Sequence, residues 1–133
     1  MYNPVPVGPS RTYQEQVANQ LTDKPFHVVE LGAAEDAVQL FSAGAAVPIG
    51  VVCEVPKSEP DSPAVAVIAI ASGEQVKVKQ SAAINKGAPV KAVNGGTVET
   101  AGAATRSIGR KVSQGAGAAG DIIVIELLPE NIP

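Results

Sequence analysis

The sequence predicts an all-β protein: a small β-barrel or β-sandwich built from two related β-units, with an extended, proline-rich N-terminal arm. Two observations lead to this prediction. From residue 26 onward, short β-rich runs alternate with glycine, asparagine and aspartate, and no amphipathic stretch reaches the length of a convincing helix. These runs also fall into two sets of similar order, and two related β-units can pack face to face around one core.

Residues 1–25 are predicted to form the arm. Pro4, Pro6 and Pro9 remove amide donors and favour an extended, polyproline-like backbone. The stretch 13–24 has the spacing for one helical turn, but it contains poor helix formers and is closed by a proline. We therefore expect this stretch to be irregular or extended.

Residues 26–133 are predicted to form a single β domain. The Asn-Gly-Gly sequence at 94–96 is typical of a tight turn between two strands. The polar, proline-rich stretch 56–63 separates two apolar runs, so we expect it to be an exposed loop. The candidate strands cover residues 26–31, 37–41, 49–55, 64–71, 75–80, 89–93, 97–100, 107–113 and 121–128.

A weak internal repeat relates the two halves of this domain. Both copies contain an Ile-Gly pair, at 49–50 in the first and at 108–109 in the second. Each copy is followed by a glycine and an acidic residue that open an alternating strand, at 73–79 and at 120–126. On this alignment the first copy carries an extra hairpin, residues 54–72. The matched segments are 28–32 with 90–95, 37–40 with 97–100, 42–46 with 101–104, and 49–52 with 108–112.

Composition limits the range of functions. A chain of 133 residues with four aromatic side chains and abundant alanine and valine buries only a lean core, so association with other copies or a larger partner is expected to add stability. The net charge of −3 and the scattered lysines and arginines argue against nucleic-acid binding. The N-terminal sequence lacks signal-peptide features and the longest apolar run, 64–71, is too short to cross a bilayer, so we expect a soluble protein made in the cytoplasm.

The sequence predicts no catalytic residue, no cofactor and no metal site. The glycine spacing at 115–120 matches a dinucleotide-binding fingerprint, but that fingerprint opens a helix, whereas this stretch leads into a strand-like run and is predicted to be a turn. His27 is the only histidine and has apolar neighbours, so we expect a structural or surface role. Cys53 is the only cysteine, which excludes an intramolecular disulfide, and its apolar surroundings predict burial. We therefore predict that the protein is not an enzyme.

Charged residues are interpreted as solvent-facing. Glu35 and Asp36 lie in one predicted loop and Glu59 and Asp61 in another, without the neighbours that would separate the pKa values of a catalytic pair. The lysines of the run 75–80 alternate with valines, as in a sheet with one wet face and one buried face.

The second half of the chain contains four short motifs in a distinctive order. They are Ala-Ala-Ile-Asn-Lys-Gly-Ala-Pro-Val-Lys at 82–91, Thr-Val-Glu at 97–99 followed directly by Thr and then Ala-Gly-Ala-Ala at 101–104, Ile-Gly-Arg at 108–110, and Ala-Gly-Ala-Ala-Gly-Asp opening an apolar strand at 116–127. This order resembles a family of short, Gly-, Ala- and Val-rich phage proteins that are similar to capsid cement or decoration proteins. The resemblance implies an all-β protein on the outer surface of the virion that binds the major capsid protein of an icosahedral head, usually as an oligomer at local symmetry axes.

Two other function classes remain open. One is a tail or surface β-module that binds protein or sugar, although sugar sites usually stack aromatic side chains and this chain has no tryptophan. The other is a β-rich enzyme such as the trimeric dUTP-hydrolysing family. That family needs an aspartate-bearing hairpin and a glycine-rich C-terminal arm with an aromatic residue, and residues 128–133 provide no such arm.

The arm supplies the candidate interface residues. Tyr2, Val5, Val7, Arg11 and Tyr13 form an aromatic, aliphatic and cationic set of the kind enriched at protein interfaces. Prolines reduce the conformational entropy that such a segment loses when it becomes ordered on a partner. We expect the arm to lie across a neighbouring subunit or the capsid protein, and a homotrimer is the favoured assembly.

Overall fold

The computed structural model describes residues 10–17, 20–44, 46–54 and 64–132 of the chain. These residues form ten strands and one short 3-10 helix, with no α-helix among them, so the all-β prediction is confirmed. The elements are β1 (Ser10–Glu15), β2 (Val28–Leu31), β3 (Ala37–Leu40), β4 (Pro48–Glu54), β5 (Ala64–Ala69), η1 (Ile70–Ser72), β6 (Gln75–Lys79), β7 (Pro89–Ala92), β8 (Val98–Thr100), β9 (Arg106–Lys111) and β10 (Ile122–Asn131).

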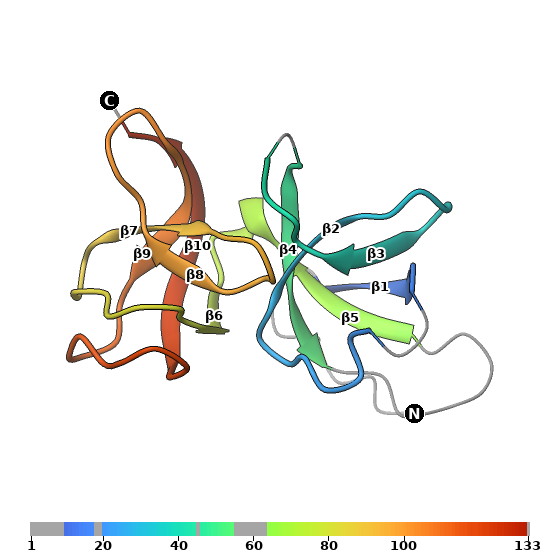
Figure 1. The fold of residues 1–133 in the computed structure, drawn as a ribbon, viewed down its shortest axis with the longest axis horizontal. Coiled ribbons are helices and arrows are strands. Elements are labelled where there is room, and N and C mark those ends of the chain that lie inside the picture. Colours follow the sequence, from blue (N-terminus) through green and yellow to red (C-terminus); the bar gives the residue numbers. More distant parts are fainter. Residues whose placement is uncertain (1–9, 18–19, 45, 55–63, 133) are drawn as a thin grey trace.

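The first five strands, which we call the first unit, close into a small barrel in the order β1-β3-β2-β4-β5. β1 closes this barrel because it runs antiparallel to β5 and parallel to β3, with Gln14 opposite Ala37. The barrel occupies the right half of Figure 1. A closed barrel leaves no free strand edge in this unit.

The last five strands, the second unit, form a sheet in the order β6-β10-β9-β7-β8 in the left half of Figure 1. Its two outer strands meet at a single parallel bridge between Gln80, which follows β6, and Val98 of β8. The amide of Ser81 also donates to the carbonyl of Val98 at 2.8 Å. The second sheet is therefore an open sheet whose two outer strands touch at one end.

The two units repeat one pairing pattern. In the first unit β2 lies between β3 and β4, and in the second β7 lies between β8 and β9. Val29 lies opposite Gly50, and Val90 lies opposite Gly109, so the Ile-Gly pairs of the sequence repeat occupy the same register. β4 then pairs with β5 and β9 with β10, both antiparallel. The two related β-units predicted from the sequence are therefore present in the fold.

The strand that closes each unit repeats as well. β1 runs antiparallel to β5 and parallel to β3, and β6 runs antiparallel to β10 and meets β8 in parallel. The Gln16 amide donates to the Val38 carbonyl in the first unit, just as the Ser81 amide donates to the Val98 carbonyl in the second, each at 2.8 Å. β6 is thus the counterpart of β1 and opens the second unit.

Two details of the sequence interpretation are corrected by this register. The runs 73–79 and 120–126 are not counterparts, because β10 corresponds to β5, and the hairpin 54–72 belongs to the common pattern instead of being an insertion. The arm does not extend to residue 25, because β1 is a barrel strand. Residues 1–9 and the predicted loop 56–63 lie outside the described residues.

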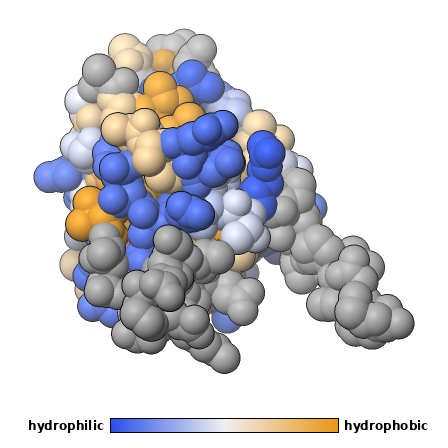
Figure 2. Space-filling model, turned by 90° about the vertical axis from the view of Figure 1, so that its right-hand side faces the viewer, coloured by the Kyte–Doolittle hydropathy of each residue, from blue (hydrophilic) through white to orange (hydrophobic). Residues whose placement is uncertain are grey.

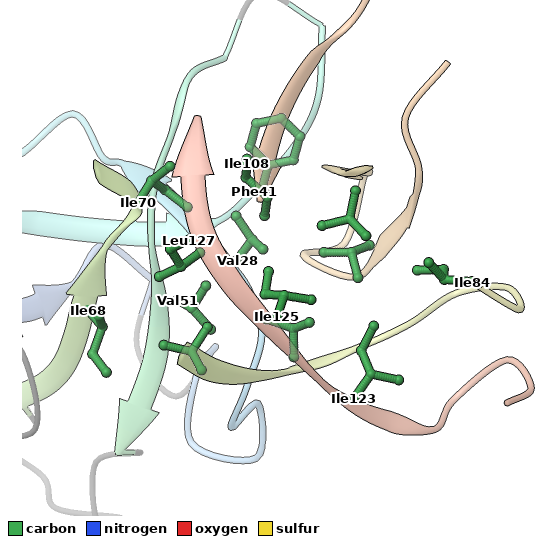
Figure 3. Close-up of a cluster of buried hydrophobic side chains, with 14 residues drawn as sticks. Val28, Phe41, Val51, Ile68, Ile70, Ile84, Ile108, Ile123, Ile125 and Leu127 are labelled. Carbon is green, nitrogen blue, oxygen red and sulfur yellow. The ribbon is translucent and has the colours of Figure 1, made fainter. Parts of the chain in front are cut away.

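One hydrophobic core runs through both units. In Figure 3, Val28 and Val51 of the first unit lie beside Ile125 and Leu127 of the second. The buried members of this core are Val28, Phe41, Val51, Ile68, Ile70, Val76, Val78, Ile84, Val90, Val98, Ile108, Ile123, Ile125 and Leu127. A smaller cluster fills the barrel and consists of Leu21, Val29, Val38, Val52, Val65 and Val67. Both clusters are almost entirely aliphatic, in agreement with the composition.

Backbone hydrogen bonds also join the units. The Phe26 amide donates to the Val52 carbonyl at 2.9 Å, and the Phe26 carbonyl accepts from the amide of Lys79 in β6 at 3.1 Å. Phe26 has a φ of 65°, and its counterpart in the second unit is Gly87, with a φ of 85°, whose amide donates to the Lys111 carbonyl. The repeated backbone therefore needs a left-handed residue here, and the first unit places a bulky aromatic at that position.

Candidate interaction site

Of the interface residues predicted in the arm, the structure describes two. Arg11 and Tyr13 both belong to β1; Arg11 is exposed, and Tyr13 is half-buried and packs against the cluster inside the barrel. Tyr2, Val5 and Val7 lie outside the described residues. Tyr13 therefore contributes to the barrel itself, and Arg11 is the exposed one of the two.

His27 has a structural environment. It is buried, and its ring nitrogen Nδ1 lies 2.8 Å from the carbonyl oxygen of Pro25, so the ring donates a hydrogen bond there. Burial lowers the pKa of His27, and the positive charges of Lys24 and Lys79 act in the same direction. The hydrogen bond to Pro25 offsets only part of this effect. The neutral form of the ring is therefore favoured in the folded protein.

A buried carboxylate, Glu30, was not singled out from the sequence. Its oxygens accept hydrogen bonds from Gln39 Nε2 at 2.8 Å, from the Ser42 amide at 2.6 Å and from Ser42 Oγ at 2.8 Å. Burial alone would raise the pKa of Glu30, but these three hydrogen bonds outweigh burial and lower it. Glu30 thereby fixes the backbone that leaves β3. An acidic residue inside an otherwise apolar strand-like run was the available signal for this role.

The remaining polar candidates are dispersed. Within residues 10–17, 20–44, 46–54 and 64–132, no three His, Cys, Asp or Glu side chains come together in a way that could hold a metal ion. Glu35 and Asp36 are exposed between β2 and β3, whereas Glu59 and Asp61 lie outside the described residues. The glycine-rich stretch 115–120 leads into β10 through turns, as predicted.

The prediction that Cys53 is buried is wrong. Cys53 is exposed, and its Sγ lies 3.3 Å from the Ala66 carbonyl oxygen. The register of β4 against β5 shifts between Val52 and Glu54, so the alternation of inward and outward side chains breaks at Cys53. In β6, where no such shift occurs, Val76 and Val78 are buried and Lys77 is exposed, as the sequence predicted.

A hollow on the described surface lies where the two units meet, and we call it the junction groove. Its volume is about 260 Å³. Two loops line it, one between β3 and β4 and one between β8 and β9; they rise at the top of Figure 1. Phe41 and Ile108, side by side in Figure 3, lie at its base. The full lining is Phe41, Ala43, Gly44, Ala46, Val47, Pro48, Lys91, Ala92, Thr105, Arg106 and Ile108.

Equivalent positions of the two units face each other across this groove. Val47 precedes Gly50 by the same distance in sequence as Arg106 precedes Gly109, and both side chains are exposed at the groove. Val47 is 59% exposed. Within the described part of the chain the Arg106 side chain has no hydrogen-bond or ion-pair partner. The acidic residue Glu130, on the adjoining strand, pairs instead with Arg110, with 2.8 Å between Arg110 Nε and Glu130 Oε1. The rim thus combines an aliphatic and a cationic side chain.

A smaller hollow of about 150 Å³ lies between β4 and β6. Phe26, Cys53 and Lys77 are among its lining residues, and the Lys77 Nζ lies 6.0 Å from the centre of the Phe26 ring. Such a distance permits a weak cation–π attraction. This contact links the left-handed Phe26 to the first strand of the second unit.

No protein-family model matches the chain, and no curated protein matches its sequence. The site is therefore interpreted from its own geometry. Among the residues that the structure describes, no helix is long and apolar enough to span a bilayer.

The lining of the junction groove is suited to contact with an apolar surface. It is mainly aliphatic, and its one hydroxyl, Thr105 Oγ1, donates to the Gly102 carbonyl instead of facing a base. Lys91 pairs with Glu99 across β7 and β8 at 3.3 Å. The sequence did not reveal the groove, because its residues come from both units and only the packing of the units brings them together.

Proposed function

We propose that this protein is a structural capsid cement protein, without enzymatic activity, that binds the outer surface of a tailed-phage head and stabilises the shell of the major capsid protein. The observation that carries the proposal is the junction groove, an apolar hollow with the unpaired cationic rim residue Arg106. An exposed apolar hollow on a small protein of otherwise mixed surface is typical of a protein-docking site. The order of short motifs in residues 82–127 supports the capsid as the partner.

The distribution of strand edges supports docking through side chains and loops. The barrel is closed and offers no free edge for strand addition to another protein. The second sheet is open, with β6 and β8 as its outer strands, and these meet at one end through the bridge between Gln80 and Val98. Exposed large apolar side chains are instead spread over the described surface; they are Val17, Leu31, Val47, Ile122 and Leu128. Each becomes stabilising when a partner covers it.

The lean core is consistent with a protein that gains stability on its partner. Valine and isoleucine make up most of both buried clusters, with one aromatic ring, Phe41, in the larger one. Binding to the folded state alone stabilises that state by mass action. A cement protein of this composition is expected to melt at a higher temperature on the head than in solution, and to self-associate as a trimer.

The proposal is tested with heads of the encoding phage that lack this protein. Purified chain is added to these heads, the mixture is sedimented, and the heads are imaged by electron cryomicroscopy. We expect co-sedimentation, added density on the outer shell, and heads that release DNA at a higher temperature. Density on the tail in place of the shell would favour a tail β-module, and absence of binding to any particle would overturn the proposal.

A separate assay addresses the enzymatic alternative. The purified chain is incubated with dUTP and Mg²⁺, and released pyrophosphate is measured. We expect no turnover above the buffer control. Turnover that disappears in an Asp121→Asn variant, whose aspartate otherwise accepts a hydrogen bond from the Ala118 amide in the glycine-rich loop, would overturn the non-enzymatic proposal.

A further inference from the structure

The last residue of β2 and the turn that follows it, residues 31–36, project from the barrel at the right of Figure 1, and we call this segment the β2–β3 tip. Leu31 is 59% exposed, and Glu35 and Asp36 are also exposed. In the part of the chain that the structure describes, neither carboxylate has a hydrogen-bond or ion-pair partner. The tip therefore combines an aliphatic side chain with two unpaired negative charges.

The tip is held in place by residues that follow the closing strand β1. The Ala34 amide donates to Gln16 Oε1 at 2.8 Å, and the Gly32 amide donates to the Ala37 carbonyl at 2.8 Å. A Cβ atom on Gly32 would lie 2.8 Å from Gln16 Cβ, so a larger residue here would push Gln16 away from the tip. Because the backbone is already fixed, binding through the tip costs little conformational entropy.

The tip and the junction groove are complementary in charge and in apolar character. The groove offers Arg106, without a partner, and Lys91, whose ion pair with Glu99 is partly exposed to solvent. Its apolar surface around Val47 and Phe41 is of the kind that a leucine side chain covers. Figure 2 shows the face at the tip-bearing end of the barrel, where hydrophilic side chains gather at the centre and an apolar area lies above them.

We propose that the junction groove of one chain receives the β2–β3 tip of a second copy of the same chain. Leu31 lies against the apolar groove, and Glu35 and Asp36 face Arg106. Tip and groove are different surfaces of one molecule, so the contact is head to tail and a closed assembly is a ring. This inference rests on the self-association included in the proposed function. The groove then joins copies of the chain, and exposed apolar side chains outside the groove and the tip, Val17, Ile122 and Leu128, are left to contact the head.

The N-terminal segment is a weaker candidate for the same groove. Residues 1–9 are Met-Tyr-Asn-Pro-Val-Pro-Val-Gly-Pro and contain no acidic side chain. They could cover the apolar base, but they offer no carboxylate to Arg106. Charge complementarity therefore favours the β2–β3 tip as the occupant.

Charge reversal on each side tests the contact. Arg106→Glu changes the groove, and Glu35→Lys with Asp36→Asn changes the tip. All three side chains are exposed, and asparagine tolerates the left-handed φ of 54° at position 36, so melting followed by circular dichroism should stay unchanged. In sedimentation velocity, each change alone should weaken self-association by roughly tenfold or more, because like charges then meet. A chain carrying all three changes should regain association to within about threefold of wild type, because the charges are again opposite.

Each outcome decides the proposal. A wild-type chain that stays monomeric at high micromolar concentration overturns it, and so does an oligomer that neither Arg106→Glu nor the tip changes weaken. Sensitivity to Arg106→Glu without sensitivity to the tip changes would indicate a different occupant. If the chain stays monomeric and binds heads, head binding stands and the tip contact is rejected. If rings form but do not bind heads, the tip contact stands and head binding is rejected.

A cysteine pair gives a second, geometric measurement. Leu31→Cys in the tip and Val47→Cys at the groove, in a Cys53→Ser background, should form a disulfide between neighbouring chains under mild oxidation, because the proposed contact places Leu31 against the apolar surface around Val47. Non-reducing gels should then show linked dimers and larger species for the double-cysteine chain. Each single-cysteine chain is the matched control and should give no ladder beyond a dimer. A double-cysteine chain that stays monomeric would contradict the contact.

Discussion

Replacing Gly109 with alanine should strongly destabilise the protein, because β9 and β10 approach closely at this position. A Cβ atom on Gly109 would lie 2.0 Å from the Glu126 carbonyl oxygen and 2.9 Å from its carbon. Both are backbone atoms of β10, so the clash is relieved only if the strands separate and ladder hydrogen bonds lengthen. Overpacking together with one or two weakened hydrogen bonds gives an expected loss of about 3–5 kcal/mol in the free energy of unfolding.

Three other glycines provide matched controls, and urea unfolding followed by far-ultraviolet circular dichroism is the assay. Gly50→Ala should resemble Gly109→Ala, because its Cβ would lie 2.6 Å from the Ile68 carbonyl oxygen. Gly87→Ala meets no atom but has a φ of 85°, and should cost about 1–2 kcal/mol. Gly102→Ala has its nearest neighbour at 3.9 Å and should be nearly neutral. A Gly109→Ala midpoint equal to that of Gly102→Ala would refute the close approach.

Four further results are expected. Folding lowers the pKa of Glu30 below its usual value of 4.5. The stabilisation from this carboxylate is therefore complete above pH 4.5 and is lost as the pH drops through the folded-state pKa. In a series of urea midpoints measured against pH, Glu30→Gln should flatten this part of the curve. The pKa of His27 is also lowered, so the unfolded state gains its proton first and stability falls as pH drops below 6.5, a loss that His27→Gln should remove. Lys111 is 1% exposed and its Nζ donates to the Ile84 carbonyl at 2.7 Å, so Lys111→Ala should lower the free energy of unfolding by about 2–4 kcal/mol. Deleting residues 1–9 should leave the melting temperature unchanged and lower occupancy on heads, whereas deleting 1–12 also removes pairing with β5 and should lower the melting temperature.

Local sequence patterns predicted most of the fold. Nine candidate strands correspond to β2 through β10, because alternation, apolar runs and glycine turns act over a few residues. β1 was missed since its partners, β3 and β5, are distant in the sequence and one pairing is parallel, so no hairpin signal marks it. Because β1 was not recognised, its counterpart β6 was matched with β10 in the sequence repeat, although β10 corresponds to β5. The register shift at Cys53 was likewise invisible, as it depends on how β4 meets β5.

The candidate site was less predictable than the fold. Among the predicted interface residues, Arg11 is exposed, whereas Tyr13 packs in the barrel. The junction groove joins Val47 and Arg106, residues that no local pattern connects. Their proximity follows from the packing of two units, which periodicity within one segment does not report.

The shared register of the two units gives this chain an internal reference. Gly50 and Gly109 occupy one site and are identical, whereas Phe26 and Gly87, or Val52 and Lys111, occupy shared sites with different side chains. Exchanging a residue for its counterpart introduces a side chain that the same backbone geometry already carries elsewhere in the molecule. Arg106→Val, for example, gives the second unit the residue that the first unit has at Val47. Such swaps separate what the backbone demands from what each unit's surroundings demand, without recourse to any other protein.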